Sequence, residues 1–260
     1  MKKIYYLIAS MAIFGCVGCA ADLSEEMVVT TPQDVVLTVN VASPKSKVSL
    51  GDRESNGGYK VYWDEGDKIS ANGYISEVAK INESNAGSAQ FEFKGAILNY
   101  PYNILYPASE SNMVHFAEEQ SYRVGSFEVG ATPMYARVEK SGDGVQLQHL
   151  SGVLRFSIKG DKEGVLLKNI ILTAGEGKIA GDFAVDYEKG APTDSAVSLL
   201  NYSFGEGLEL SKETAKEFFV VLPCGEFGVC SAELHTADGR TMKLLFRTSG
   251  QSAIKAGVVR

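Results

Sequence analysis

Apolar and polar residues alternate in short runs along most of the chain, and turn residues separate the runs. The clearest runs are 35–42 (VVLTVNVA), 89–94 (AQFEFK), 153–158 (VLRFSI), 165–172 (VLLKNIIL) and 217–222 (EFFVVL). A period of two is typical of half-buried strands, and strands that recur at short intervals predict an all-β protein with antiparallel sandwich structure. Further strands are predicted at 77–82, 100–106, 112–116, 121–129, 133–136, 145–150, 182–187 and 195–204.

The segment 59–73, YKVYWDEGDKISANG, contains the single tryptophan of the chain, Trp63. Its alternating first half is interrupted at 65–67 by turn chemistry, so it predicts a hairpin corner in which Trp63 anchors the core. Asp64, Glu65 and Asp67 offer carboxylates to a hard cation such as calcium. They lack the 12-residue calcium loop and its closing glutamate, and we therefore predict no metal site there.

Two glycine-containing segments are predicted to be turns. Residues 229–235 and 241–246 alternate around Asp238-Gly239, which predicts a hairpin. The segment 175–181, GEGKIAG, has three glycines but does not open a helix, so it lacks the context of a dinucleotide-binding loop and is interpreted as a β-turn. The last residues, 257–260, are expected to begin another strand.

Composition is consistent with a β protein that is not directed at nucleic acid. The 260 residues, 45% of them hydrophobic, suffice for one large or two ordinary domains. Twelve tyrosines and twelve phenylalanines favour strands. The formal net charge is −7, and no basic stripe is present to neutralise phosphates, which argues against a nucleic-acid partner.

Residues 1–19 are predicted to be a targeting segment rather than part of the fold. Lys2 and Lys3 precede an apolar run that is too short to span a bilayer. Its end, GCVGCAA, resembles the lipobox of bacterial lipoproteins, in which a cysteine is acylated and becomes the new N-terminus. Cys19 is the preferred lipidation site and Cys16 the alternative. Residues 20–33 are acidic and are interpreted as a tether between the membrane and the folded part.

The segment 43–58 is predicted to be an exposed loop after the first strand. It is rich in Gly, Pro, Lys and Arg, and exposed basic loops are natural sites of trypsin-like cleavage. A cut would leave the first strand with the lipid and the domain without that strand. An intact connection is the alternative.

Reactive groups are sparse in the sequence. His115, His149 and His235 have no metal-ligand spacing, and no catalytic signature is present, so neither an enzyme nor a cofactor is predicted. Cys224 and Cys230 flank a GEFG segment. An exported location permits a disulfide between them, and two free thiols are the alternative.

Several segments in a fixed order resemble the fimbrillin family of surface lipoproteins from Gram-negative anaerobes, which is related to type V pili. They are the lipobox, the tether, the first strand with its basic loop, YKVYWDEGDKI, YNILYPAS, Gln120-Ser121-Tyr122 followed by SFEVGATPMYA, and LSGVLRFSIKG with the downstream KIAGDF.

The resemblance implies two tandem β-sandwich domains of transthyretin-like topology, which we expect at 34–144 and 145–260. It implies an outer-membrane lipoprotein at the cell surface, with other fimbrial subunits or a surface ligand as partners. It also implies cleavage in the 43–58 loop, for which Arg53 matches best and Lys45 and Lys47 are alternatives, followed by insertion of a strand from another subunit. Assembling members supply or use extra terminal residues, so a sequence that ends at Arg260 argues against a polymerising shaft subunit and leaves a tip, an anchor or a stand-alone surface adhesin.

Two further predictions accompany this interpretation. Asp194-Ser195-Ala196 resembles a bacterial O-glycosylation acceptor triplet, which makes Ser195 a candidate. The alternative function is that of a glycan- or ligand-binding surface lipoprotein that does not polymerise. Exposed aromatic side chains would serve that function, and the candidates are Tyr100, Tyr102 and Tyr106.

Overall fold

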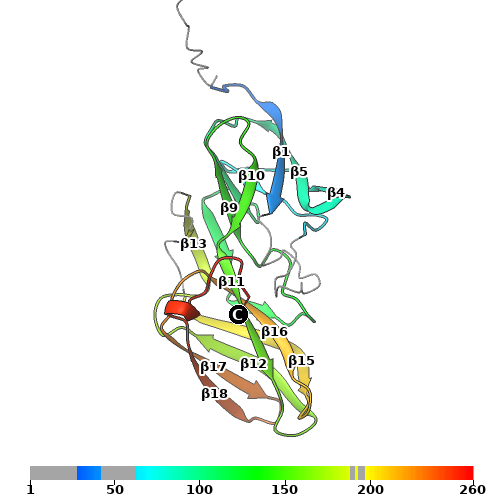
Figure 1. Cartoon of the computed structure of the whole chain (residues 1–260), viewed down its shortest axis with the longest axis vertical. Coiled ribbons are helices and arrows are strands. Elements are labelled where there is room, and N and C mark those ends of the chain that lie inside the picture. The colour runs from blue at the N-terminus through cyan, green and yellow to red at the C-terminus, as the bar shows by residue number, and fades with distance from the viewer. Residues whose placement is uncertain (1–27, 42–61, 188–190, 193–196, 260) are drawn as a thin grey trace, which may run out of the picture.

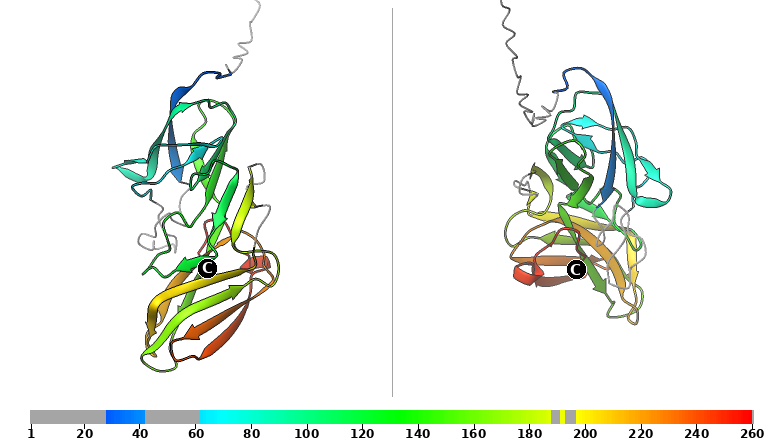
Figure 2. Two further views of the ribbon diagram at one scale, coloured as in Figure 1. Left: turned by 180° about the vertical axis from the view of Figure 1, so that it is seen from behind. Right: turned by 45° about the horizontal axis from the view of Figure 1, so that its top comes forward.

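The computed structural model describes residues 28–41, 62–187, 191–192 and 197–259. Its regular structure is β-strand, apart from one turn of 3₁₀-helix at Gly250–Ser252. The prediction of an all-β protein is therefore confirmed. Figure 1 shows an elongated molecule in which an N-terminal group of strands lies above a C-terminal group, and Figure 2 shows the same arrangement from two other sides.

An eight-stranded sheet, called here the N-terminal sheet, forms the upper part of the molecule. Its order is β3-β2-β6-β9-β10-β1-β5-β4. Val39 and Val41 of β1 and Phe91 and Phe93 of β5 share a core with Tyr106 of β6, so the two ends of the sheet curl over one interior. The strands are β1 (Gln33–Val41), β2 (Ser70–Ala71), β3 (Tyr74–Ile75), β4 (Lys80–Asn82), β5 (Asn85–Ala96), β6 (Tyr102–Tyr106), β9 (Met134–Val138) and β10 (Val145–His149).

Strand β10 makes this curl by changing partner along its length. Val145 and Leu147 pair in parallel with β1, whereas Gln148 and His149 pair antiparallel with β9. Alternate residues of β10 are buried, as the period-two pattern predicted. Each fully buried aliphatic or aromatic side chain contributes about 1.5–3 kcal/mol, which makes this shared core the main stabilising feature of the sheet.

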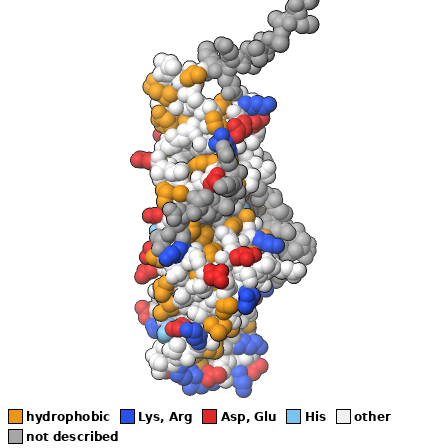
Figure 3. All heavy atoms as spheres, turned by 90° about the vertical axis from the view of Figure 1, so that its left-hand side faces the viewer, with side chains coloured by type: hydrophobic (Ala, Val, Ile, Leu, Met, Phe, Trp, Pro, Cys, Tyr) orange, Lys and Arg blue, Asp and Glu red, His pale blue; other side chains and the backbone are white. Residues whose placement is uncertain are grey.

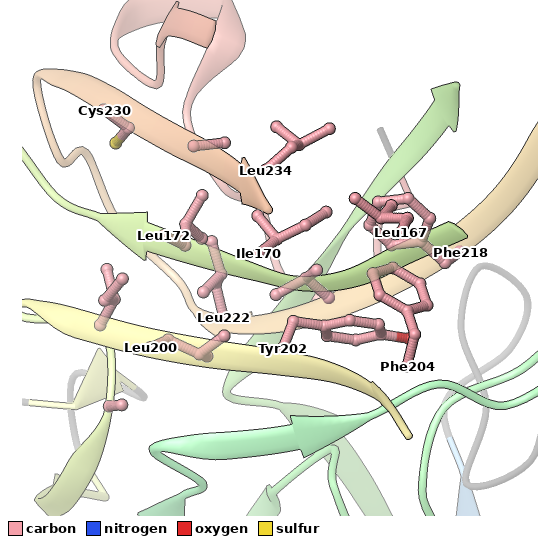
Figure 4. Packing of buried hydrophobic residues seen from close by; sticks show 14 of the residues in the cluster. Leu167, Ile170, Leu172, Leu200, Tyr202, Phe204, Phe218, Leu222, Cys230 and Leu234 are labelled. Atoms are coloured by element: carbon pink, nitrogen blue, oxygen red, sulfur yellow. The ribbon is translucent and has the colours of Figure 1, made fainter. Parts of the chain in front are cut away.

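Two facing sheets, called here the C-terminal sheet pair, form the lower part. A five-stranded sheet has the order β18-β17-β12-β15-β8, and a two-stranded sheet consists of β11 and β16. Figure 4 shows Phe218 of β16 packing near Tyr202 and Phe204 of β15. The strands are β8 (Glu119–Ser121), β11 (Ser151–Ile158), β12 (Val165–Thr173), β15 (Leu199–Leu210), β16 (Lys216–Pro223), β17 (Val229–Thr236) and β18 (Thr241–Arg247).

A narrow three-stranded ribbon connects the two parts. It is formed by β7 (Met113–Phe116), β13 (Gly181–Asp186) and β14 (Ala191–Pro192). Phe116 and Phe183 meet edge to face with their ring centroids 5.0 Å apart, in a small core that also includes Leu105 of β6. The ribbon therefore packs against the N-terminal sheet although β13 lies late in the sequence.

The sheet pairing divides the chain differently from the predicted boundary between residues 144 and 145. Strand β10 begins at Val145 but pairs within the N-terminal sheet, while the earlier β8 pairs with β15 in the C-terminal sheet pair. The prediction of antiparallel strands throughout is also wrong at two places, because β1 with β10 and β15 with β8 are parallel pairs.

Some predicted strands are shorter or absent. In 121–129 only Ser121 is in a strand, because Phe127 folds back onto a small cluster with Val153 and Phe219. The expected strand at 257–260 is represented by one isolated bridge between Val259 and Val153. The hairpin of β17 and β18 around Asp238-Gly239 is confirmed.

Charged side chains of both signs are interspersed along the face shown in Figure 3, where no single-sign patch gathers. In the part of the chain that the structure describes, we find no helix of the length and apolar character needed to cross a bilayer.

Candidate functional site

Strand β1 lies inside the N-terminal sheet, with β5 on one side and β10 on the other (Figure 1). Its pairing with β5 is antiparallel and places Leu37 opposite Phe91 and Val39 opposite Ala89. Val39 is fully buried, and Val35 and Leu37 pack against the same core. The alternating pattern of 35–42 therefore describes a strand with one face in the core.

Removal of β1 would uncover an apolar groove with two unpaired edges. The groove would be lined by buried side chains of its neighbours, including Phe91, Phe93 and Leu147. The backbone N–H and C=O groups of β5 and β10 that now pair with β1 would lose their partners, which is costly unless another strand replaces them. The groove can accept a strand that carries apolar side chains at alternate positions.

The residues predicted to be processed or modified lie outside the described residues. They are the lipidation candidates Cys19 and Cys16, the cleavage candidates Arg53, Lys45 and Lys47, and the glycosylation candidate Ser195. The last residue of β1, Val41, stands two positions before the predicted cleavage loop in the sequence.

The corner at Trp63 is a packed turn, as predicted. Trp63 is buried and meets Phe91 and Tyr106 edge to face, at centroid distances of 4.9 and 5.4 Å. Tyr62 and Trp63 are not in a strand, however, although their segment alternates; the backbone N–H of Trp63 donates to the carbonyl of Ala86 instead.

Asp67 has a structural role in this corner. One carboxylate oxygen accepts a hydrogen bond from the Tyr106 hydroxyl at 2.8 Å, and the other accepts from the backbone N–H of Asp64 at 2.8 Å. Burial raises the pKa of Asp67, and burial beside that carboxylate raises the pKa of Tyr106. Among the described residues no group of three or more His, Cys, Asp or Glu side chains is arranged to hold a metal ion.

The three candidate aromatic residues of the glycan-binding alternative differ in exposure. Tyr102 and Tyr106 are buried, so the expectation that they are exposed is wrong; both side chains face the core of the N-terminal sheet, as alternate residues of one strand do. Tyr100 precedes that strand and is half-buried. Its ring stacks on Tyr102 with centroids 4.0 Å apart and an interplanar angle of 15°.

Tyr100 lines an open polar cavity of about 500 Å³. The cavity is bounded by the turn between β2 and β3, the segment before β6, the segment before β7, and Tyr187 after β13. Its lining residues are Ser70, Asn72, Gly73, Asn99, Tyr100, Pro101, Asn103, Glu110, Ser111, Asn112 and Tyr187.

Asn72 fixes the floor of this cavity. Its amide Nδ2 donates to the carbonyls of Asn99 and Pro101, at 2.9 and 3.2 Å, and its Oδ1 accepts from the backbone N–H of Asn103 at 2.8 Å. Asn72 is the one non-glycine residue with positive φ, 49°, in the described part of the chain. Asn and Gly tolerate this conformation, so the Asn72-Gly73 pair forms the two-residue turn between β2 and β3.

Cys224 and Cys230 are free thiols in this structure, so the possible disulfide between them is not formed here. Cys230 points into the core of the C-terminal sheet pair, where its Sγ lies 3.6 Å from both the Phe227 carbonyl and the Thr248 hydroxyl. Cys224 lies beyond the end of β16, and its backbone N–H donates to the carbonyl of Leu150. Burial raises the pKa of Cys224 to about 12, so this thiol is protonated at neutral pH.

The three histidines lie in different environments. His115 pairs with Asp182 across β7 and β13 at 2.8 Å, and both side chains are exposed. His149 is buried in β10, and burial lowers its pKa to about 4. His235 contacts the Thr241 hydroxyl at 3.2 Å on the exposed hairpin. They do not converge on one site.

No protein-family model matches the chain, and no curated protein matches its sequence. The sequence predicted Tyr100 as an aromatic candidate but gave no signal for Asn99, Glu110 and Asn112. These residues share no local motif, because the cavity is assembled from segments far apart in the chain.

Proposed function

We propose that the protein is a lipid-anchored, fimbrillin-like surface protein that serves either as a structural subunit or as an accessory (tip or anchor) subunit of a pilus or cell-adhesion fibre. The observation that supports this most directly is the position of β1, an N-terminal strand inserted between β5 and β10 and followed by the basic 43–58 loop. The N-terminal sheet and the C-terminal sheet pair correspond in this proposal to two β-sandwich domains of transthyretin-like topology.

Assembly would proceed by replacement of β1. A cut at Arg53, or at Lys45 or Lys47, would separate β1 from the rest of the sheet. A strand of another subunit would then pair with β5 and β10 and place its alternate apolar side chains where Val39 and Val41 now lie. Backbone pairing and shape alone would drive this step, so no catalytic residue is needed.

Anchoring would use the acylated cysteine, Cys19 or Cys16, at the outer membrane. Each buried methylene of an acyl chain contributes about 0.8 kcal/mol, so a multiply acylated cysteine binds a membrane firmly. The acidic tether, 20–33, would keep the folded part clear of the lipid surface. N-terminal sequencing of protein recovered from cells would identify both the acylated cysteine and any loss of β1.

Limited trypsin treatment of the purified chain tests the exchange. We expect one main cut within 43–58, followed by slow conversion of monomer to polymer, measured by size-exclusion chromatography and electron microscopy. The triple variant Lys45→Gln, Lys47→Gln, Arg53→Gln should stay intact and monomeric. Clean cleavage that leaves the monomer unchanged, with β1 still bound, would contradict the proposal.

A peptide supplies a sharper version of this test. The sequence QDVVLTVNVA, added in excess to the cut protein, should occupy the vacated groove and block polymerisation. A matched peptide with Asp in place of the valine at the Val39 position should not block it, because a carboxylate in that position would be buried without a partner. Equal effects of the two peptides would show that the groove does not bind the strand.

A further inference from the structure

We propose that the polar cavity beside Tyr100 binds a neutral saccharide. The cavity is about 500 Å³, within the range of about 300–1,000 Å³ that small-molecule sites occupy. This inference concerns the uncut monomer and does not depend on strand exchange.

The cavity has a preformed floor. The side chain of Asn72 donates two hydrogen bonds and accepts one, and these three bonds tie the β2–β3 turn to the segment 99–103. Gly73 packs so closely that an added Cβ would lie 2.9 Å from the carbonyl oxygen of Glu110, which brings the third segment into the same assembly. A rigid floor lowers the entropy cost of binding, because few groups must be ordered when a ligand arrives.

The chemistry of the lining excludes several ligand classes. None of the described lining residues is Lys or Arg, so none of them would neutralise a phosphate, a sulfate or an acidic sugar. Pro101 is the single non-aromatic apolar side chain among the described lining residues, so a lipid chain would find almost no aliphatic side chain there. One carboxylate, Glu110, is too few for a divalent cation. Amides, hydroxyls and tyrosine rings remain, and these suit a polyhydroxylated neutral ligand.

Several polar groups of the cavity are available for such a ligand. The side chains of Glu110 and Asn112, and the hydroxyls of Tyr100 and Tyr187, make no hydrogen bond to another described residue. Burial raises the pKa of Tyr187 to about 12, so its hydroxyl remains protonated at neutral pH and can donate as well as accept. An amide, a carboxylate and two hydroxyls together offer the mixed donors and acceptors that sugar hydroxyls require.

Tyr100 supplies an aromatic surface, and one face of its ring is held in place by Tyr102. Its ring stacks on that of Tyr102, which is buried in the core of the N-terminal sheet. The C–H face of a pyranose ring packs well on such a ring, while the hydroxyls around its edge reach the polar lining. Aromatic packing and convergent polar groups thus occur in one cavity, which is the combination that fixes the orientation of a small ligand.

The test is binding of the uncut chain to a glycan array, followed by calorimetry with the bound neutral oligosaccharide and with polygalacturonate as the acidic comparison. We expect binding of neutral glycans and not of polygalacturonate. Tyr100→Ala and Asn112→Ala should each weaken that binding by about ten-fold or more. Thermal unfolding of each variant, measured in parallel, confirms that it is folded.

Glu110→Ala and Glu83→Ala form a matched pair, because Glu83 is exposed in a turn and does not line the cavity. We expect the first to weaken binding and the second to leave it unchanged. The inference is overturned if no neutral glycan binds, if acidic glycans bind preferentially, or if folded Tyr100→Ala and Asn112→Ala variants bind as the unmodified chain does. Because the protein is not cleaved in these measurements, their failure is distinguishable from a failure of strand exchange.

Discussion

Strands β1 and β18 both carry alternating apolar side chains, yet they are covered very differently. Val39 of β1 is 0% exposed, and β1 has a strand on each side. Met242 and Leu244 of β18 are 56% and 43% exposed, and the sheet order places β17 as the one neighbour of β18. The cross-strand partner of Leu244, Ala232, is fully buried on the same side of the sheet.

The difference arises from the opposing layer. Among the described strands, β11 and β16 face the five-stranded sheet of the C-terminal sheet pair, with Ile254 of the C-terminal segment in the same core, and this layer does not cover the whole of the outer strand β18. Phe246 still meets Phe156 of β11, at a centroid distance of 6.1 Å. Met242 and Leu244, which lie nearer the β17–β18 turn, are exposed to solvent instead. An apolar pattern therefore tells which side of a strand faces a core, whereas the width of the facing sheet decides whether that side is buried.

The largest expected effect comes from one charge placed in each strand. Val39→Asp should reduce the free energy of unfolding by about 3 kcal/mol or more, because the carboxylate would be buried without a partner. Leu244→Asp, the matched change in β18, should cost less than about 1 kcal/mol, since its carboxylate can reach water. Urea denaturation measures both, and equal losses would show that β18 is covered in solution.

The dependence of stability on pH extends the comparison to the strands next to β1 and β18, which are β10 and β17. Burial lowers the pKa of His149, in β10 beside β1, from 6.5 to about 4. Between these values the unfolded chain binds a proton that the folded chain does not, so stability should fall as the pH decreases from about 6.5 to 4. The loss should reach up to about 3 kcal/mol.

His149→Gln should flatten this part of the stability profile. His235→Gln, in β17 beside β18, is the control and should retain the acid-induced loss. Denaturation midpoints across the pH range provide the measurement. An unchanged profile in His149→Gln would mean that another group is responsible.

The smallest expected changes in stability come from the removal of single hydroxyl groups. Tyr106→Phe should cost about 1–3 kcal/mol, because the buried carboxylate of Asp67 loses its 2.8 Å hydrogen bond. Thr241→Val, at the start of β18, removes a hydroxyl that lies 3.2 Å from His235 on an exposed surface and should change stability by less than about 0.5 kcal/mol. Thermal unfolding compares the pair; similar losses would argue against a special role for the Asp67–Tyr106 contact.

Local patterns predicted most strands but not their partners. Alternation located β5, β12, β16 and the β17–β18 hairpin, because burial of one face of a strand requires apolar residues at alternate positions within a short segment. It could not show that β10 completes the N-terminal sheet, since this depends on the parallel pairing of Val145 with Val39. Alternation at Tyr62 and Trp63 did not produce a strand, because the chain turns there around a buried indole.

The candidate sites also show that local sequence patterns do not reveal contacts between distant segments. The first strand and its basic loop can be recognised in sequence because they are contiguous. The polar cavity cannot, because its lining comes from four separate segments and its floor depends on hydrogen bonds between Asn72 and residues about thirty positions away. The two thiols were close in sequence, but Cys230 faces a core and Cys224 lies past the end of another strand.

The parallel pairing of β1 with β10 also constrains the order of folding. Val39 pairs with Val145, which is synthesised more than a hundred residues later. Until then β5 is the only one of its two partner strands with which β1 can pair. Long-range contacts of this kind slow folding, because a large loop must close before the pairing contributes free energy. We therefore expect the folding chain to pass through a partly closed intermediate, in which the pairing of β1 with β10 is the last contact of the N-terminal sheet to be completed.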